Sequence, residues 1–276
     1  MKFSVCAVDR DLPTDIPFPL RGKTYGECAS IAKSLGYDGI ELQIQDPLQV
    51  DQKYLKNVLD SYGLQASAIT TGLAYTYEGM SMTHPDPIIR RATIERLKRQ
   101  LDLAKYLNSQ ILVGFIRGRK QPGWTDDEYE KILTESVAQV LSYSEEIQTP
   151  FVMEQINRND GDVFCSTERT VAFLEKFNSD WLVYNGDTYH MMTEDTDIGA
   201  AIKRSLNKLV LFHVSDAGRS IPDDKHFNFY EAAEVLKKAK YDKWVSIECK
   251  PLPNTYEATR AGIEYLKRVF SKEVNI

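Results

Sequence analysis

The chain has 276 residues, of which 42% are hydrophobic and 27% charged, an ordinary composition for a globular protein of one large domain or two smaller ones. Its formal net charge of -6 argues against a nucleic-acid-binding protein, which normally carries a basic surface. No apolar run is long enough for a transmembrane helix, and the first residues resemble a strand rather than a signal peptide. The four cysteines lack CxxC spacing, which is typical of reduced thiols. We therefore expect a cytoplasmic protein without a membrane partner.

Short apolar segments alternate with helical patterns eight times. In chain order, the sequence predicts strand and helix pairs at 3–8 and 25–35, 39–44 and 51–62, 66–71 and 85–107, 110–116 and 129–147, 151–156 and 166–177, 181–185 and 195–206, 208–214 and 229–239, and 244–249 and 254–269. This alternation predicts a (β/α)8 TIM barrel that forms a single domain over residues 1–276. An open doubly wound sheet is disfavoured because residues 9–15, after the first strand, lack a glycine-rich turn.

Each of the last four predicted strands has a potential metal ligand at or near its C-terminal end: Glu154, Asp187, His213 and Glu248. A charge that closes a buried strand costs free energy unless it is paired or bound to a metal. Since the C-terminal ends of barrel strands lie on one face, the four side chains should converge there. Three carboxylates and one imidazole favour Mn, Mg or Co, with Zn as an alternative. Glu41 ends the second predicted strand similarly, but a buried ion pair explains it equally well.

Several local motifs resemble those of the xylose-isomerase-like TIM-barrel superfamily, and most closely its D-tagatose and D-psicose 3-epimerase branch. They are Leu35-Gly-Tyr-Asp-Gly-Ile-Glu41, Glu154-Gln-Ile-Asn-Arg158, Asp187-Thr-Tyr-His190, and His213 with Arg219 six residues later. The resemblance implies a sugar isomerase or epimerase that acts on a ketose or ketose derivative through an enediolate. It also implies a homodimer or homotetramer with a small carbohydrate as its substrate.

The same resemblance implies roles for individual residues. Glu154 and Glu248 would be both metal ligands and the catalytic acid and base, with Asp187 and His213 completing the ligand set. His190 and Arg219 would bind substrate oxygens. Asp160 stands where the family has a longer acidic residue, and we expect it to contact the substrate as well.

Two questions stay open at this level. The loop Gly114-Phe-Ile-Arg-Gly-Arg-Lys120 places three cations beside two glycines, so Arg117 and Arg119 could bind a phosphorylated or acidic sugar, or simply face solvent. The alternative reaction is that of a metal-dependent dehydratase of the same superfamily, of the inosose or dehydroshikimate type. Both reactions start by removing a proton next to a carbonyl.

Overall fold

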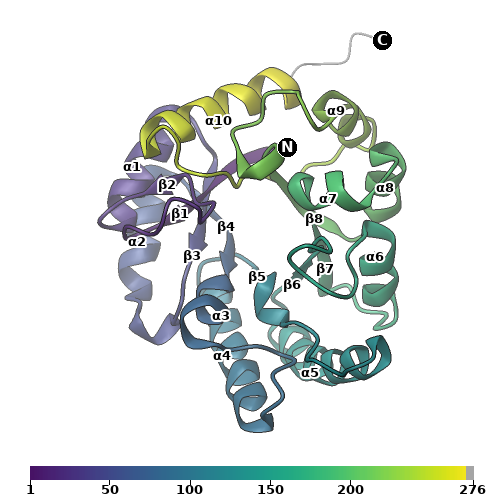
Figure 1. Cartoon of the computed structure of the whole chain (residues 1–276). Helices are drawn as coiled ribbons and strands as arrows, with labels where there is room; N and C mark the ends of the chain where they lie inside the picture. Colours follow the sequence, from purple (N-terminus) through teal and green to yellow (C-terminus); the bar gives the residue numbers. More distant parts are fainter. Residues whose placement is uncertain (272–276) are drawn as a thin grey trace.

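Parallel strands form a closed barrel in the computed structural model, which describes residues 1–271 (Figure 1). Neighbours along the sheet follow chain order, and pairing of the first strand with the last closes it. The barrel strands are β1 (Lys2–Val8), β3 (Gly39–Gln43), β4 (Gln65–Thr70), β5 (Ile111–Val113), β6 (Phe151–Glu154), β7 (Leu182–Asp187), β8 (Leu209–Val214) and β9 (Trp244–Ile247). A short strand, β2 (Leu20–Arg21), pairs with β1 beside the barrel. The predicted (β/α)8 barrel is therefore confirmed; residues 272–276 of the predicted domain lie outside the described residues.

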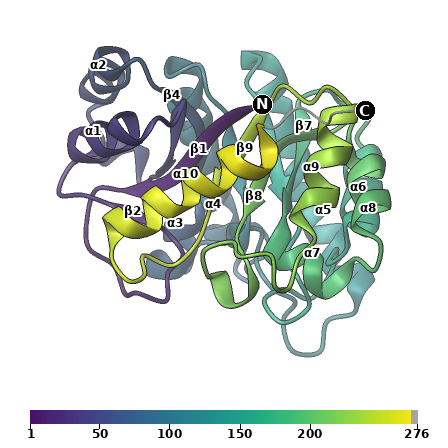
Figure 2. The ribbon, with the colours of Figure 1, turned by 90° about the horizontal axis from the view of Figure 1, so that it is seen from above.

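Helices surround the strands, as the view along the barrel and the perpendicular view both show (Figures 1 and 2). They are α1 (Tyr25–Leu35), α2 (Gln52–Tyr62), α3 (Gly72–Glu78), α4 (Pro87–Tyr106), α5 (Asp126–Ile147), α6 (Thr167–Glu175), α7 (Thr188–Glu194), α8 (Ile198–Ser205), α9 (Phe229–Lys238) and α10 (Thr255–Phe270). Short 3-10 turns are η1 (Pro47–Gln49), η2 (Phe115–Arg117) and η3 (Ala217–Arg219). Among the helices of residues 1–271, none has the length and apolarity needed to cross a membrane.

The alternation of side chains along each strand decides which residues enter the barrel. Val152, Val183 and Leu211 belong to a small buried cluster, which also contains Ala68, Leu112 and Trp244. Because side chains two residues apart on a strand share a face, Glu154 and His213 point the same way as Val152 and Leu211. The apolar cluster thus fills the barrel interior on the N-terminal side of the polar residues.

Two predicted elements differ clearly from the structure, and two further helices were not predicted. β5 ends at Val113 instead of residue 116, because Gly114, with φ -102° and ψ -106°, leaves the extended conformation and η2 follows. The predicted helix 195–206 is shorter, since Asp197 caps α8 through the Ala200 N–H. Helices α3 and α7 were not expected; each has only seven residues, too few for a clear periodic pattern.

Candidate metal centre

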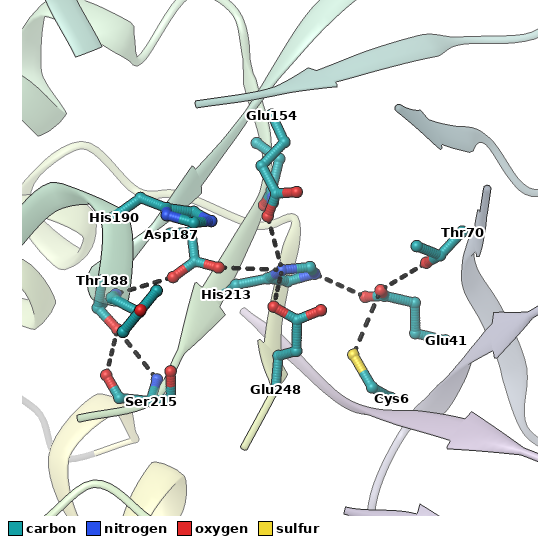
Figure 3. Close-up of polar contacts among 12 residues, drawn as sticks. Cys6, Glu41, Thr70, Glu154, Asp187, Thr188, His190, His213, Ser215 and Glu248 are labelled. Atoms are coloured by element: carbon teal, nitrogen blue, oxygen red, sulfur yellow. Dashed lines mark hydrogen bonds and ion pairs between the residues drawn. The ribbon is translucent and has the colours of Figure 1, made fainter. Parts of the chain in front are cut away.

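Glu154, Asp187, His213 and Glu248 meet at the C-terminal end of the barrel (Figure 3). Each offers one ligand atom, and these atoms all lie within 4.8 Å of one another. The strand register explains the convergence: Asp187 on β7 is paired directly with His213 on β8, while Glu154 and Glu248 come from the flanking strands' ends. The structure thus brings together the four residues that the sequence singled out.

The ring nitrogen Nδ1 of His213 is central to this cluster. It lies 3.2 Å from Glu154 Oε1, 3.6 Å from Asp187 Oδ2 and 3.2 Å from Glu248 Oε2. Nevertheless it is buried and makes no hydrogen bond within the described residues. An unprotonated ring nitrogen that faces three carboxylate oxygens is repulsive unless a cation lies among them. The donor set therefore fits a divalent metal of the hard or borderline type.

Glu41 orients the His213 ring from its other side. His213 Nε2 lies 2.9 Å from Glu41 Oε2, and Figure 3 shows Glu41 opposite the three carboxylates. The Thr70 hydroxyl and the Cys6 thiol donate to Oε1 of the same carboxylate, at 2.8 and 3.3 Å. A carboxylate at Nε2 keeps the proton on that nitrogen and leaves the Nδ1 lone pair free for a metal. Glu41 is therefore part of the centre, rather than an independent ion pair.

Burial and charge set the protonation of the cluster in the absence of a metal. Burial, reinforced by the nearby Glu248 and Asp187 carboxylates, raises the pKa of Glu154 to about 7. Burial opposes the charged form of His213, but the Glu41 and Glu248 carboxylates outweigh burial and raise its pKa well above the usual value. Burial also acts against ionisation of Asp187, yet the Arg219 guanidinium holds its pKa well below the usual range. Three carboxylates in one place thus require compensating positive charge.

Arg219 supplies part of that charge at the edge of the cluster. Its Nη1 lies 2.6 Å from Asp187 Oδ2 and 2.8 Å from Glu248 Oε2, and its guanidinium covers the Tyr189 ring at 4.4 Å. The backbone of Arg219 has a positive φ of 59°, a conformation that costs free energy in a non-glycine residue and that often occurs at functional sites. The guanidinium is thereby placed at the cavity wall, where it can contact a bound ligand.

Of two other predicted substrate contacts near the loop after β6, Asp160 lines the cavity, whereas His190 is 1% exposed and does not. The Asn157 N–H donates to Nδ1 of His190, whose Nε2 lies 3.1 Å from Arg219 Nη2. Burial, with help from Arg219, lowers the pKa of His190 to about 3, so this ring is neutral. The Asn157 side chain accepts from the N–H groups of Asn159 and Asp160, at 2.9 and 3.2 Å. This turn brings Asp160 to the cavity.

A cavity of about 280 Å³ opens beside the four ligands. Glu154, Glu248 and Arg219 form its polar floor, together with Thr70. The remaining wall is formed by Asp15, Ile16, Pro17, Phe18, Gly72, Leu73, Thr76, Gly114, Phe115, Asp160 and Tyr189. The wall is largely apolar, as in pockets that enclose a small ligand and fix it with few polar groups. It is the candidate binding site for a substrate at this centre.

The structure corrects the prediction that Arg117 binds substrate. This side chain is 2% exposed and donates to the carbonyl oxygens of Glu154 and Val163, at 3.1 and 3.0 Å. It does not line the cavity. Arg119 likewise pairs with Asp162, at 3.2 Å, outside the cavity. Both cations stabilise the loops around the site, because buried carbonyls and a nearby carboxylate compete successfully for their N–H groups.

Sequence reasoning missed several residues of the site. Asn185 and Gly114 contact Glu154, and the apolar wall comes from the loop 16–18 and from α3. For Asn185 a signal was present, because it lies two residues before Asp187 and must share its face. The wall residues gave no such signal, since loop residues carry no periodicity.

The chain is similar in sequence to known sugar epimerases. A relative named L-ribulose 3-epimerase, from Methylomonas sp. (strain DH-1), is 25% identical over 219 residues, which cover 79% of this chain and 75% of the relative. A ketose 3-epimerase from Arthrobacter globiformis is also 25% identical, covering 78% of this chain and 74% of the relative. Both are enzymes of the sugar isomerase kind, as expected from the sequence motifs.

Solved structures show the same fold over nearly the whole chain. The structure of 3-keto-D-glucoside 4-epimerase from E. coli matches with a TM-score of 0.81 at 18% identity, covering 97% of this chain and 99% of that one. D-allulose 3-epimerase from Methylomonas sp. in complex with D-allulose also matches with a TM-score of 0.81, at 17% identity, covering 98% and 97%. The sequence profile of the xylose isomerase-like TIM barrel family matches residues 29–269. The chain therefore belongs to the xylose isomerase-like TIM barrel family.

Proposed function

We propose that this protein is a divalent-metal-dependent epimerase or isomerase of an uncharged ketose. The observation that carries the proposal is the meeting of Glu154 and Glu248 at Nδ1 of His213, with both carboxylates also bordering the cavity. In Figure 3 the two carboxylates reach His213 from opposite sides. Two carboxylates so placed can exchange protons with one carbon atom of a ligand between them.

The proposed reaction begins when one of these glutamates removes the proton from a carbon next to the carbonyl. The electrons of the broken C–H bond form the C=C bond of an enediolate, and the carbonyl oxygen takes up the negative charge. The other glutamate returns a proton to the opposite face of that carbon, which inverts it. Return of the proton to the former carbonyl carbon, with transfer of the hydroxyl proton from the neighbouring oxygen to the former carbonyl oxygen, would move the carbonyl instead, which is isomerisation. Either glutamate can act as the base, depending on which epimer is bound, because both carboxylates border the cavity.

A divalent metal at the four ligands, with Mn, Mg and Co as the best candidates, would polarise the carbonyl and offset the charge of the enediolate. Arg219 adds a fixed positive charge beside the same oxygens, and the neutral His190 ring lies next to its guanidinium. Donors that are already in position need no rearrangement during the reaction. These residues thus stabilise the developing charge, while Asp160 and Thr76 at the wall are placed to bind hydroxyl groups.

The charge of the cavity favours a neutral sugar over a phosphorylated or acidic one. Asp15, Asp160, Glu154 and Glu248 line it, while Arg219 is its one cationic side chain among the described residues. That guanidinium already contacts Asp187 and Glu248. Apart from the metal, a phosphate would meet four carboxylates and no unpaired cationic side chain among those that line the cavity, which is unfavourable. This supports a free ketose, or a glycoside with a keto group, as substrate.

Product analysis tests the proposal and separates it from the dehydratase alternative. Protein loaded with Mn would be incubated with neutral ketoses, ketose phosphates and keto-acids, and products would be followed by NMR and ultraviolet absorption. We expect an epimer or aldose from a neutral ketose. Loss of water with an ultraviolet-absorbing enone would instead establish the dehydratase reaction, and turnover restricted to phosphorylated sugars would contradict the charge argument.

A further inference from the structure

Asn185 is a buried amide in contact with one oxygen of Glu154. It lies on β7, directly opposite Glu154 in the register of β6 and β7, and is fully buried. Its Nδ2 donates to Glu154 Oε1 at 3.0 Å, while its own Oδ1 has no hydrogen-bond partner within residues 1–271. A buried amide with an unpartnered oxygen costs free energy of folding. The position is therefore poorly explained by stability alone.

The two oxygens of Glu154 have different surroundings. Oε1 receives the Asn185 hydrogen bond and lies 3.2 Å from His213 Nδ1, so it faces the metal ligands. Oε2 lies against the backbone of Gly114, so close that a methyl group on that residue would overlap it. Gly114 lines the substrate cavity. Asn185 and Gly114 thus act on opposite ends of the carboxylate and restrict its rotation.

We propose that Asn185 is a positioning residue that directs Glu154 Oε1 to the metal ligands and leaves Oε2 as the oxygen that exchanges protons with the substrate. An amide nitrogen can only donate, so it holds a carboxylate oxygen without competing for the proton or for the metal. A carboxylate that rotates freely would spend part of its time with neither oxygen in position. The inference rests on the proposed function, because it assigns a role within that proton transfer.

Two near-isosteric substitutions separate positioning from packing. Asn185→Leu keeps the branched shape but removes the donor, whereas Asn185→Asp keeps the polarity and adds another carboxyl group to the cluster. If Asn185 only filled space, Asn185→Leu would retain activity. If it served only as a polar group, Asn185→Asp would retain activity and would be the milder change. Ser246→Ala is a matched control, because Ser246 is a buried residue without a hydrogen-bond partner, two residues before the ligand Glu248.

The readout is exchange of the ketose α-proton with deuterated water at saturating Mn, together with a crystal structure of metal-free Asn185→Leu. We expect kcat for exchange to fall by about 10- to 100-fold in Asn185→Leu, with KM within about threefold of wild type. Asn185→Asp should be at least as impaired, and Ser246→Ala should match wild type. In the crystal structure, the Glu154 carboxylate should be rotated relative to wild type.

Four outcomes would overturn the role of Asn185: an unchanged kcat in Asn185→Leu, full recovery of that variant when Mn is raised further, a milder effect of Asn185→Asp, or an unrotated Glu154 carboxylate. Failure of the proposed function looks different, since the wild-type protein would then show no exchange with any ketose. The crystal structure still decides whether Asn185 holds the Glu154 carboxylate in place, because it needs no activity.

Discussion

Replacing Glu41 by glutamine tests how the fold prepares His213 as a ligand. The substitution keeps the size of the side chain, but its amide can present either an oxygen or an NH2 group to His213 Nε2. With the NH2 group toward the ring, Nε2 must give up its proton, which then moves to Nδ1 and blocks the metal. With the oxygen toward the ring, the NH2 group meets the Thr70 hydroxyl and Cys6 thiol, which both donate in the wild type. Either arrangement is worse than the carboxylate.

Loss of such an orienting partner typically lowers metal affinity by about 10- to 100-fold. That range corresponds to about 1.4 to 2.7 kcal/mol of binding free energy. Titration of Mn into metal-free Glu41→Gln, followed by calorimetry, measures it directly, and circular dichroism checks the fold. Cys6→Ser is the control, because a hydroxyl still donates to Glu41 and should leave the affinity near that of wild type. An affinity of Glu41→Gln within about twofold of wild type would refute the assigned role of Glu41.

Three further predictions follow from the same geometry. Metal binding should release about one more proton at pH 6 than at pH 8, because Glu154, with a pKa of about 7, is protonated in the metal-free protein only at the lower pH. His213 should lose its proton at both pH values, since its pKa is raised well above the usual value. Calorimetry in buffers of different ionisation enthalpy measures the number of protons released, and equal release at the two pH values would contradict the prediction. Gly114→Ala should displace Glu154 Oε2, because the added methyl group would overlap that oxygen, and should lower kcat for exchange by about 100-fold with little change in melting temperature. A wild-type kcat would contradict the close contact between Gly114 and Glu154. Arg117→Met should lower the free energy of unfolding by about 2–4 kcal/mol, since it removes the donor to two backbone carbonyls. Arg119→Ala, which removes an ion pair with Asp162, should change it by less than about 1 kcal/mol. Denaturant titration compares the two variants, and equal effects would contradict the structural role of Arg117.

The barrel and its ligand quartet were predictable because both depend on regular periods. Apolar strands alternate with helices, and parallel strands present their C-terminal ends on one face. Any charged residue that closes such a strand therefore points to that face, as Glu154 and His213 do. Glu41 also lies near the C-terminal end of a strand, but its partner, His213, is 172 residues away along the chain. Only the closed barrel shows that the carboxylate reaches His213 Nε2.

The loops were less predictable because a charge in a loop has many potential partners. Arg117 appeared suited to bind an anion, yet two backbone carbonyls within reach take up its guanidinium. The position of Asn185, two residues before Asp187, indicated the face but not the role, because an amide inside an apolar strand gives the same pattern whether it stabilises the fold or contacts a catalytic group. The direction of its hydrogen bond to Glu154 distinguishes the two, and this becomes visible only with the side chains in place.

The most direct test of the central claim is deuterium incorporation into a neutral ketose by the Mn-loaded protein and by its Glu248→Gln variant. Mass spectrometry would follow the substrate in deuterated water, with and without prior removal of metal by a chelator. We predict incorporation at the carbon next to the carbonyl by the loaded wild-type protein, and its loss in the chelated protein and in Glu248→Gln. Incorporation at the wild-type rate in Glu248→Gln, or in chelated protein, would contradict proton transfer by this pair of glutamates at a metal centre.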